Sequence, residues 1–118
     1  MKQQEYISAY KVIQKYENEK LPLDIAYGLF KVKKILQDQW DFEVAREQEI
    51  FDLYNPEASE ENTFTFKSVE DQKNFTKDFS ELLNMEVDKA FEKVKIDFGT
   101  RIEMSVADIE VLSNFIEF

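Results

Sequence analysis

Apolar side chains recur every three or four residues from the start of the chain, which is the spacing of one face of a helix. The first helix is predicted over 3–17, with Tyr6, Tyr10 and Ile13 on its apolar face. Each tyrosine hydroxyl needs a polar partner, so this face should be half buried. A short polar turn over 18–20 separates it from the next helical run.

A much longer helix is predicted over 22–54, because Pro22 opens it and no further proline interrupts it. At a rise of 1.5 Å per residue it would be roughly 50 Å long, which is more than the width of a compact domain of this size. The protein should therefore be organised around this helix. Its single glycine, Gly28, costs about 1 kcal/mol relative to alanine, and we expect it to allow close approach of another backbone.

The apolar stripe of the long helix is regular in its first half and drifts in its second half. It consists of Ile25, Leu29, Val32, Leu36, Trp40, Val44, Phe51 and Tyr54. The first half should pair with the shorter first helix as an antiparallel hairpin. The second half, from Asp38, extends beyond that partner, and we expect it to pack on the C-terminal region or on another subunit.

Strand and helix signals alternate in the remaining sequence. An acidic loop over 55–62 leads to a half-buried strand over 63–67, in which two phenylalanines alternate with threonines. Ser68 is the expected N-cap of a helix. A β-hairpin is predicted over 93–104, and Ser105 caps a last helix. That helix is expected to turn four apolar residues inward, namely Ile109, Leu112, Phe115 and Ile116.

These signals predict an α+β fold in a single domain over 1–118. A long antiparallel helical hairpin over 1–55 precedes a mixed part over 56–118, which holds a small antiparallel sheet and two short helices. The hydrophobic content of 43 % includes eleven Phe and is enough to bury a core. No apolar run approaches the roughly 18 residues of a membrane span, and the polar N-terminus is unlike a signal peptide, so we expect no membrane association.

The chain is acidic, with a net charge of -10 from 25 acidic and 15 basic residues. The densest stretch, 38–61, holds nine acids and one base. Such a surface repels nucleic acid and anionic membranes, so no direct nucleic-acid binding is expected; solubility alone would also account for it. A small basic cluster places Lys31 and Lys34 on one face of the long helix and Lys33 on another. We expect these lysines to be solvated or to pair with nearby acids such as Asp38.

Catalytic chemistry has few candidates in this sequence. Cysteine and histidine are absent, which excludes thiolate nucleophiles, histidine bases and zinc sites of the Cys/His type. Glu43 and Glu47, one helical turn apart, could bind a divalent cation or share a proton. We favour a solvated face with a Glu43–Arg46 contact, because carboxylate metal sites in helical bundles also use histidine. No cofactor and no metal site is predicted.

The acidic part of the long helix is the candidate partner-binding site. Its hypothesised contact residues are Asp38, Trp40, Asp41, Glu49 and Asp52. The four acids fall roughly on one side of the helix, whereas two further glutamates point elsewhere. On a rigid helix, acids at fixed intervals can imitate a row of phosphates and occupy a nucleic-acid channel. Acids spread around the helix would provide only solubility.

Four groups of residues, in a fixed order, carry a likeness to known proteins. They are Leu21-Pro22 with Ala26-Tyr27 and Lys31, Glu43-x-x-Arg46-Glu47 with Tyr54, Glu81-Leu82-Leu83-Asn84-x-Glu86-Val87, and Met104-Ser105-x-x-Asp108 with Leu112. Over most of its length the chain resembles small proteins encoded by tailed bacteriophages and prophages. The resemblance implies a phage context, and it transfers no site residues because these relatives lack an established activity.

We therefore expect a non-catalytic, phage-encoded protein–protein interaction module that serves as a virion or assembly component, in the host cytoplasm or in the particle. The length mismatch between the two N-terminal helices favours self-association, so the partner is a second copy or another protein. The alternative is an acidic, nucleic-acid-mimicking inhibitor of a host nucleic-acid-binding or defence protein. A carboxylate-dependent enzyme that uses Glu43 and Glu47 is the third and least favoured class.

Overall fold

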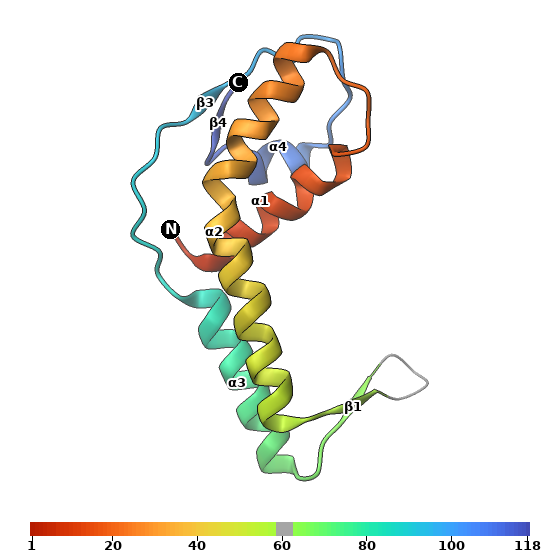
Figure 1. The fold of residues 1–118 in the computed structure, drawn as a ribbon, viewed down its shortest axis with the longest axis vertical. Helices are drawn as coiled ribbons and strands as arrows, with labels where there is room; N and C mark the ends of the chain where they lie inside the picture. The colour runs from red at the N-terminus through yellow and green to blue at the C-terminus, as the bar shows by residue number, and fades with distance from the viewer. Residues whose placement is uncertain (59–62) are drawn as a thin grey trace.

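One long helix sets the shape of the protein (Figure 1). The computed structural model describes residues 1–58 and 63–118, so Glu60 and Glu61 of the predicted acidic loop lie outside the described residues. Helix α2 (Leu23–Tyr54) has 32 residues, which corresponds to a length of about 48 Å. The molecule measures 52 × 34 × 21 Å with a radius of gyration of 17.3 Å, against about 13.5 Å for a compact chain of this length. The predicted dominance of the long helix is confirmed.

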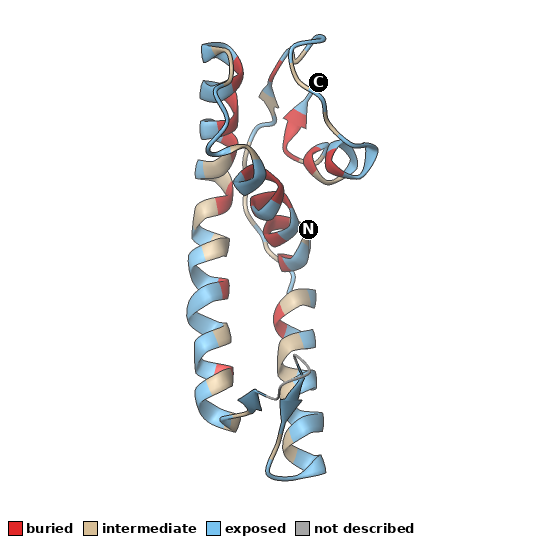
Figure 2. Cartoon of the chain, turned by 90° about the vertical axis from the view of Figure 1, so that its right-hand side faces the viewer, coloured by how far each residue is buried: buried red, intermediate tan, exposed pale blue. Residues whose placement is uncertain are grey.

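The upper half of α2 belongs to a packed region that we call the head, which comprises 1–40 and 87–118. Helix α1 (Gln3–Tyr16) packs against α2 and also contacts α4 (Val106–Leu112). Both views show α1 crossing α2 obliquely (Figures 1 and 2). The predicted long antiparallel hairpin is therefore not confirmed, because the two helices meet across one another and not along their lengths.

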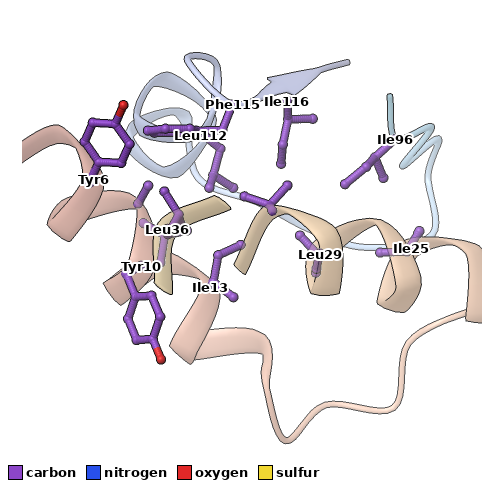
Figure 3. Packing of buried hydrophobic residues seen from close by; sticks show 13 residues of the cluster. Tyr6, Tyr10, Ile13, Ile25, Leu29, Leu36, Ile96, Leu112, Phe115 and Ile116 are labelled. Atoms are coloured by element: carbon purple, nitrogen blue, oxygen red, sulfur yellow. The ribbon is translucent and has the colours of Figure 1, made fainter. Parts of the chain in front are cut away.

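The head contains the main hydrophobic core, which joins the N- and C-terminal parts of the chain (Figure 3). Its buried members include Tyr6, Tyr10, Ile13, Ile25, Leu29, Leu36, Ile96, Leu112, Phe115 and Ile116. The apolar face predicted for the first helix and the first half of the long helix is confirmed. Val44 and Ile109 are exposed, so their predicted burial is wrong. The seven-residue α4 presents Leu112 and the turn after it to the core, which leaves Ile109 outside.

The C-terminal strands pair differently from the prediction. Strand β3 (Val94–Lys95) pairs in parallel with β4 (Ile116–Glu117), so the predicted hairpin over 93–104 is wrong. Burial of Ile116 in the core brings the end of the chain beside β3. The segment after β3 turns instead toward α2, where the Arg101 guanidinium donates two hydrogen bonds of 2.8 Å to the carboxylate of Asp24.

The lower half of α2 packs against α3 (Val69–Asn84), forming a region that we call the stem, residues 41–58 and 63–84 (Figure 1). This confirms that the second half of the long helix finds a partner in the C-terminal region. Strands β1 (Glu57–Ala58) and β2 (Phe64–Thr65) form a two-residue antiparallel pair at its end. An aromatic cluster, separate from the head core, joins these elements around Phe51, whose ring centroid lies 5.3 Å from that of Phe75.

Local signals place the starts of α3 and α4 and the end of α2 where the sequence predicts them, whereas α4 ends at Leu112, before Phe115 and Ile116 of the predicted helix. The Ser68 hydroxyl accepts a hydrogen bond of 3.1 Å from the backbone N–H of Asp71, and Ser105 accepts one of 3.1 Å from Asp108. Both serines therefore satisfy a backbone donor that a helix start leaves unpaired. At the end of α2, Asn55 adopts a left-handed conformation with φ of 42°, which asparagine tolerates better than most residues.

Gly28 faces a side chain and not another backbone, so the sequence-based expectation for it is wrong. A Cβ added at this position would lie 2.6 Å from Cγ1 of Ile96. That distance is well inside van der Waals contact. The missing side chain therefore lets the segment around β3 pack directly on α2.

A candidate protein-interaction surface on α2

A regular row of exposed residues follows the side of α2 that faces away from the core. We call it the outer edge; it consists of Tyr27, Lys31, Lys34, Asp38, Asp41, Ala45, Glu49 and Asp52. At 100° per residue these positions fall within a strip about 80° wide, centred about 160° from the buried positions of the helix. Figure 2 accordingly shows the buried positions of α2 only on its inner side. All of its residues are exposed.

The outer edge is divided by charge. Its upper part carries Lys31 and Lys34 and no acid, and its lower part carries the four acids that the sequence analysis predicted to share one side. The structure places these acids together on one exposed strip. Trp40 is not among them, because its indole stacks on the Tyr10 ring, with a centroid distance of 4.3 Å, and packs against the head core.

Large apolar side chains flank the upper charges. Tyr27 and Phe30 are 56 % and 51 % exposed, and their rings stack with centroids 6.1 Å apart. The Nζ of Lys31 lies 4.7 Å from the centroid of Tyr27, and the Nζ of Lys34 lies 5.2 Å from that of Phe30. These cation–π contacts hold both ammonium groups on the outer edge. These contacts were not predicted from the sequence, although each lysine follows an aromatic residue at i, i+4 spacing.

The carboxylates of Asp38 and Asp41, in the middle of the outer edge, make only weak contacts within the chain. The Asp38 side chain is 84 % exposed, and its carboxylate lies 3.7 Å from the Nζ of Lys89, which itself donates a shorter hydrogen bond of 2.6 Å to the backbone oxygen of Ile35. Asp41 accepts one hydrogen bond of 2.9 Å, from the amide of Gln37 on the same helix. Exposed contacts of this kind contribute little to stability, so both carboxylates are available to a partner.

Glu43, predicted to lie on a solvated face, is instead only 1 % exposed and sits against the fully buried Gln3. The Gln3 amide donates to the backbone oxygen of Gln39 at 2.9 Å and to Oε1 of Glu43 at 3.4 Å. Within the described part of the chain, two oxygens, Oε1 of Gln3 and Oε2 of Glu43, have no hydrogen-bond partner. The sequence could not show this burial, because it depends on where the start of α1 crosses α2.

Burial raises the pKa of the Glu43 carboxyl, since the charged form is desolvated, and repulsion from Glu47 acts in the same direction. Protonation would convert Oε2 of Glu43 from an acceptor into a donor. The predicted contact of Glu43 with Arg46 does not form; Arg46 donates to Glu49 at 2.8 Å. Glu43 is thus a buried structural carboxyl between α1 and α2.

The described residues contain no group of three or more metal-ligating side chains suitably placed to hold a metal ion. Within the same residues, no helix combines the length and apolar character that crossing a bilayer requires. Comparison with known proteins adds no assignment, because no protein-family model, curated protein or solved structure matches the chain. The outer edge must therefore be interpreted from its own geometry and charge.

Proposed function

We propose that this chain is a non-catalytic protein–protein interaction module whose contact surface is the outer edge of α2. The observation that carries the proposal is the exposure of large apolar side chains beside ordered charges, on the side of the helix opposite the core. Exposed apolar patches rimmed by polar groups mark interaction sites, and aromatic residues are enriched at interfaces. Tyr27 on the outer edge and Phe30 and Phe42 directly beside it supply this character.

The proposal includes a phage context, in which the module serves as a virion or assembly component. It is supported by the resemblance to small phage and prophage proteins and by the elongated shape. A helix of about 48 Å presents its contact residues in a fixed row, as a structural component of a particle requires. The partner is then a protein of the particle, including other copies of this chain.

The test is incorporation into phage particles. Phage-producing cells would express the wild type, the double variant Tyr27→Ser/Phe30→Ser or the control Val44→Ser. Val44 is exposed and lies off the outer edge. Mass spectrometry of purified particles and assembly intermediates should detect the wild type and the control, with the double variant depleted several-fold. Absence of the wild-type chain from both preparations would contradict the assembly role, and equal incorporation of all three proteins would contradict the role of the outer edge.

An acidic inhibitor of a nucleic-acid-binding protein is a second candidate, favoured by the exposed row Asp38, Asp41, Glu49 and Asp52. The row spans 14 residues, or about 21 Å, giving one charge per roughly 7 Å against 3.4 Å along one DNA strand. This low density ranks the inhibitor below the interaction module. If the inhibitor function holds, reversing all four acids should abolish inhibition of the target, and added salt should weaken it steeply; unchanged inhibition would exclude it.

A further inference from the structure

We propose that the partner of the outer edge is a second copy of this chain, paired with it through antiparallel contact of the two α2 helices about a two-fold axis level with residue 36. This inference rests on the proposed function and specifies its partner. Under this symmetry, residue i of one copy faces residue 72 − i of the other. Such a two-fold contact is self-complementary, because each surface element meets its complement twice.

The charges of the outer edge match this register. Its six residues from Tyr27 to Ala45 are spaced 4-3-4-3-4, which is the heptad spacing of a helix–helix seam. In the proposed register Lys31 faces Asp41 of the second copy, and Lys34 faces Asp38 of the second copy. Two-fold symmetry doubles these contacts to four ion pairs. Parallel pairing would instead place lysine against lysine and aspartate against aspartate.

The apolar side chains match the same register. Tyr27 faces the small Ala45 of the second copy, so its ring meets a gap and not a charge. Phe30 and Phe42, each about half exposed in one copy, flank the seam on opposite sides, where the second helix would cover part of each ring. The paired segment, 27–45, has a length of about 27 Å.

Neighbouring registers are unfavourable for the same charges. A shift of one heptad in one direction brings Asp38 against Asp41 of the second copy at the symmetry axis, and a shift in the other direction brings Lys31 against Lys34. Like charges placed directly opposite one another select against a wrong pairing. Figure 2 shows α2 along the outside of the molecule, so a second helix can approach it there.

The test uses two charge-reversed variants and their mixture. In Lys31→Glu/Lys34→Glu every proposed ion pair becomes acid against acid, and in Asp38→Lys/Asp41→Lys every pair becomes lysine against lysine. When the two variants are mixed, both halves of the mixed dimer again pair opposite charges. The control Lys73→Glu/Lys77→Glu makes the same change in net charge as Lys31→Glu/Lys34→Glu, on exposed residues of α3.

Sedimentation velocity at physiological salt should show concentration-dependent dimers for the wild type and the control. Each outer-edge variant alone should dimerise about tenfold or more weakly, and the equimolar mixture should recover the wild-type affinity. A wild type that stays monomeric to millimolar concentration, variants that dimerise normally, or a mixture that fails to recover would each overturn the inference. If dimerisation fails but particle incorporation still requires Tyr27 and Phe30, the proposed function stands with a different partner.

Discussion

Replacing Glu43 by glutamine should stabilise the protein at neutral pH. The Glu43 carboxyl is buried against Gln3, and each of the two side chains has one oxygen without a hydrogen-bond partner. A glutamine has nearly the same shape, and its amide supplies the donor that the unpaired oxygen of Gln3 lacks. It also removes a buried negative charge.

The size of the effect follows from the unpaired groups. A buried polar group without a partner costs about 1–3 kcal/mol, so Glu43→Gln should raise the free energy of unfolding by about that amount at pH 7. At about 4 °C per kcal/mol for a chain of this size, the melting temperature should rise by about 4–12 °C. The control Glu43→Leu removes the charge but leaves Gln3 unpaired, so its gain should be smaller.

The gain should depend on pH with a definite sign. An unfolded glutamate ionises near pH 4.3, and burial raises the pKa of Glu43 above that value in the folded protein. Between the two pKa values the folded state binds more protons, so this group makes the wild type less stable as pH rises. Glu43→Gln lacks this contribution, and its advantage should grow from pH 4 toward pH 8.

Urea unfolding followed by circular dichroism at several pH values measures this difference directly. Comparison with the wild type at each pH cancels the contributions of the other carboxylates, which both proteins share. A difference in unfolding free energy that stays constant from pH 4 to pH 8 would refute the buried, proton-binding role of Glu43. If Glu43→Gln instead lost stability at neutral pH, favourable interactions of the ionised Glu43 carboxylate would outweigh the cost of burying its charge.

Two further substitutions test the packing of the head. Gly28→Ala should lower the free energy of unfolding by up to about 2 kcal/mol in urea titrations, because overpacking against Ile96 costs more than the roughly 1 kcal/mol gained in helix propensity; a gain in stability would show that Ile96 yields freely. Asp108→Asn should lower the free energy of unfolding by about 1–2 kcal/mol at pH 7, because the Asp108 carboxylate accepts a hydrogen bond of 2.9 Å from Lys15. This hydrogen bond lowers the pKa of Asp108, so the stability that it contributes is present above about pH 3.9 and is lost at lower pH; a pH-independent effect in acid titrations would contradict this origin.

Features encoded within one helix were predictable from the sequence. Pro22 and the uninterrupted run after it define α2, and Ser68 and Ser105 begin two helices through contacts three residues away. The buried positions Ile25 and Leu29 follow from a 3.6-residue period alone. Each of these depends on neighbours in sequence, and local physical chemistry is sufficient to determine it.

Features that depend on contacts distant in sequence were not predictable. The segment around Val94 alternates as a strand should, but the alternation does not identify its partner, and Ile116 lies 22 positions away along the chain. Burial of Glu43 depends in the same way on Gln3, 40 positions away. Nothing in the acidic pattern around Glu43 distinguishes it from its exposed neighbours.

Part of the candidate site could be predicted from the sequence. The exposed strip that holds Asp38 and Asp41 follows from helical periodicity, and the shared face of Lys31 and Lys34 follows from the same rule. Their opposition across a two-fold axis also requires that this side of α2 be exposed. All outer-edge residues are exposed, with the Lys89 side chain reaching Asp38, whereas Trp40, the fifth predicted contact residue, packs against the head core.

The distance between two copies of one spin label tests the antiparallel pairing most directly. The native chain has no cysteine, so Val44→Cys gives a single labelling position, exposed and off the outer edge. In the proposed dimer the two labels are separated by 16 residues along the helix axis and by one helix spacing, which places their backbones about 26 Å apart. Pulsed dipolar EPR should give a distribution centred near that distance. A distance below about 15 Å, as in-register parallel helices would give, or the absence of any dipolar signal, would contradict the pairing.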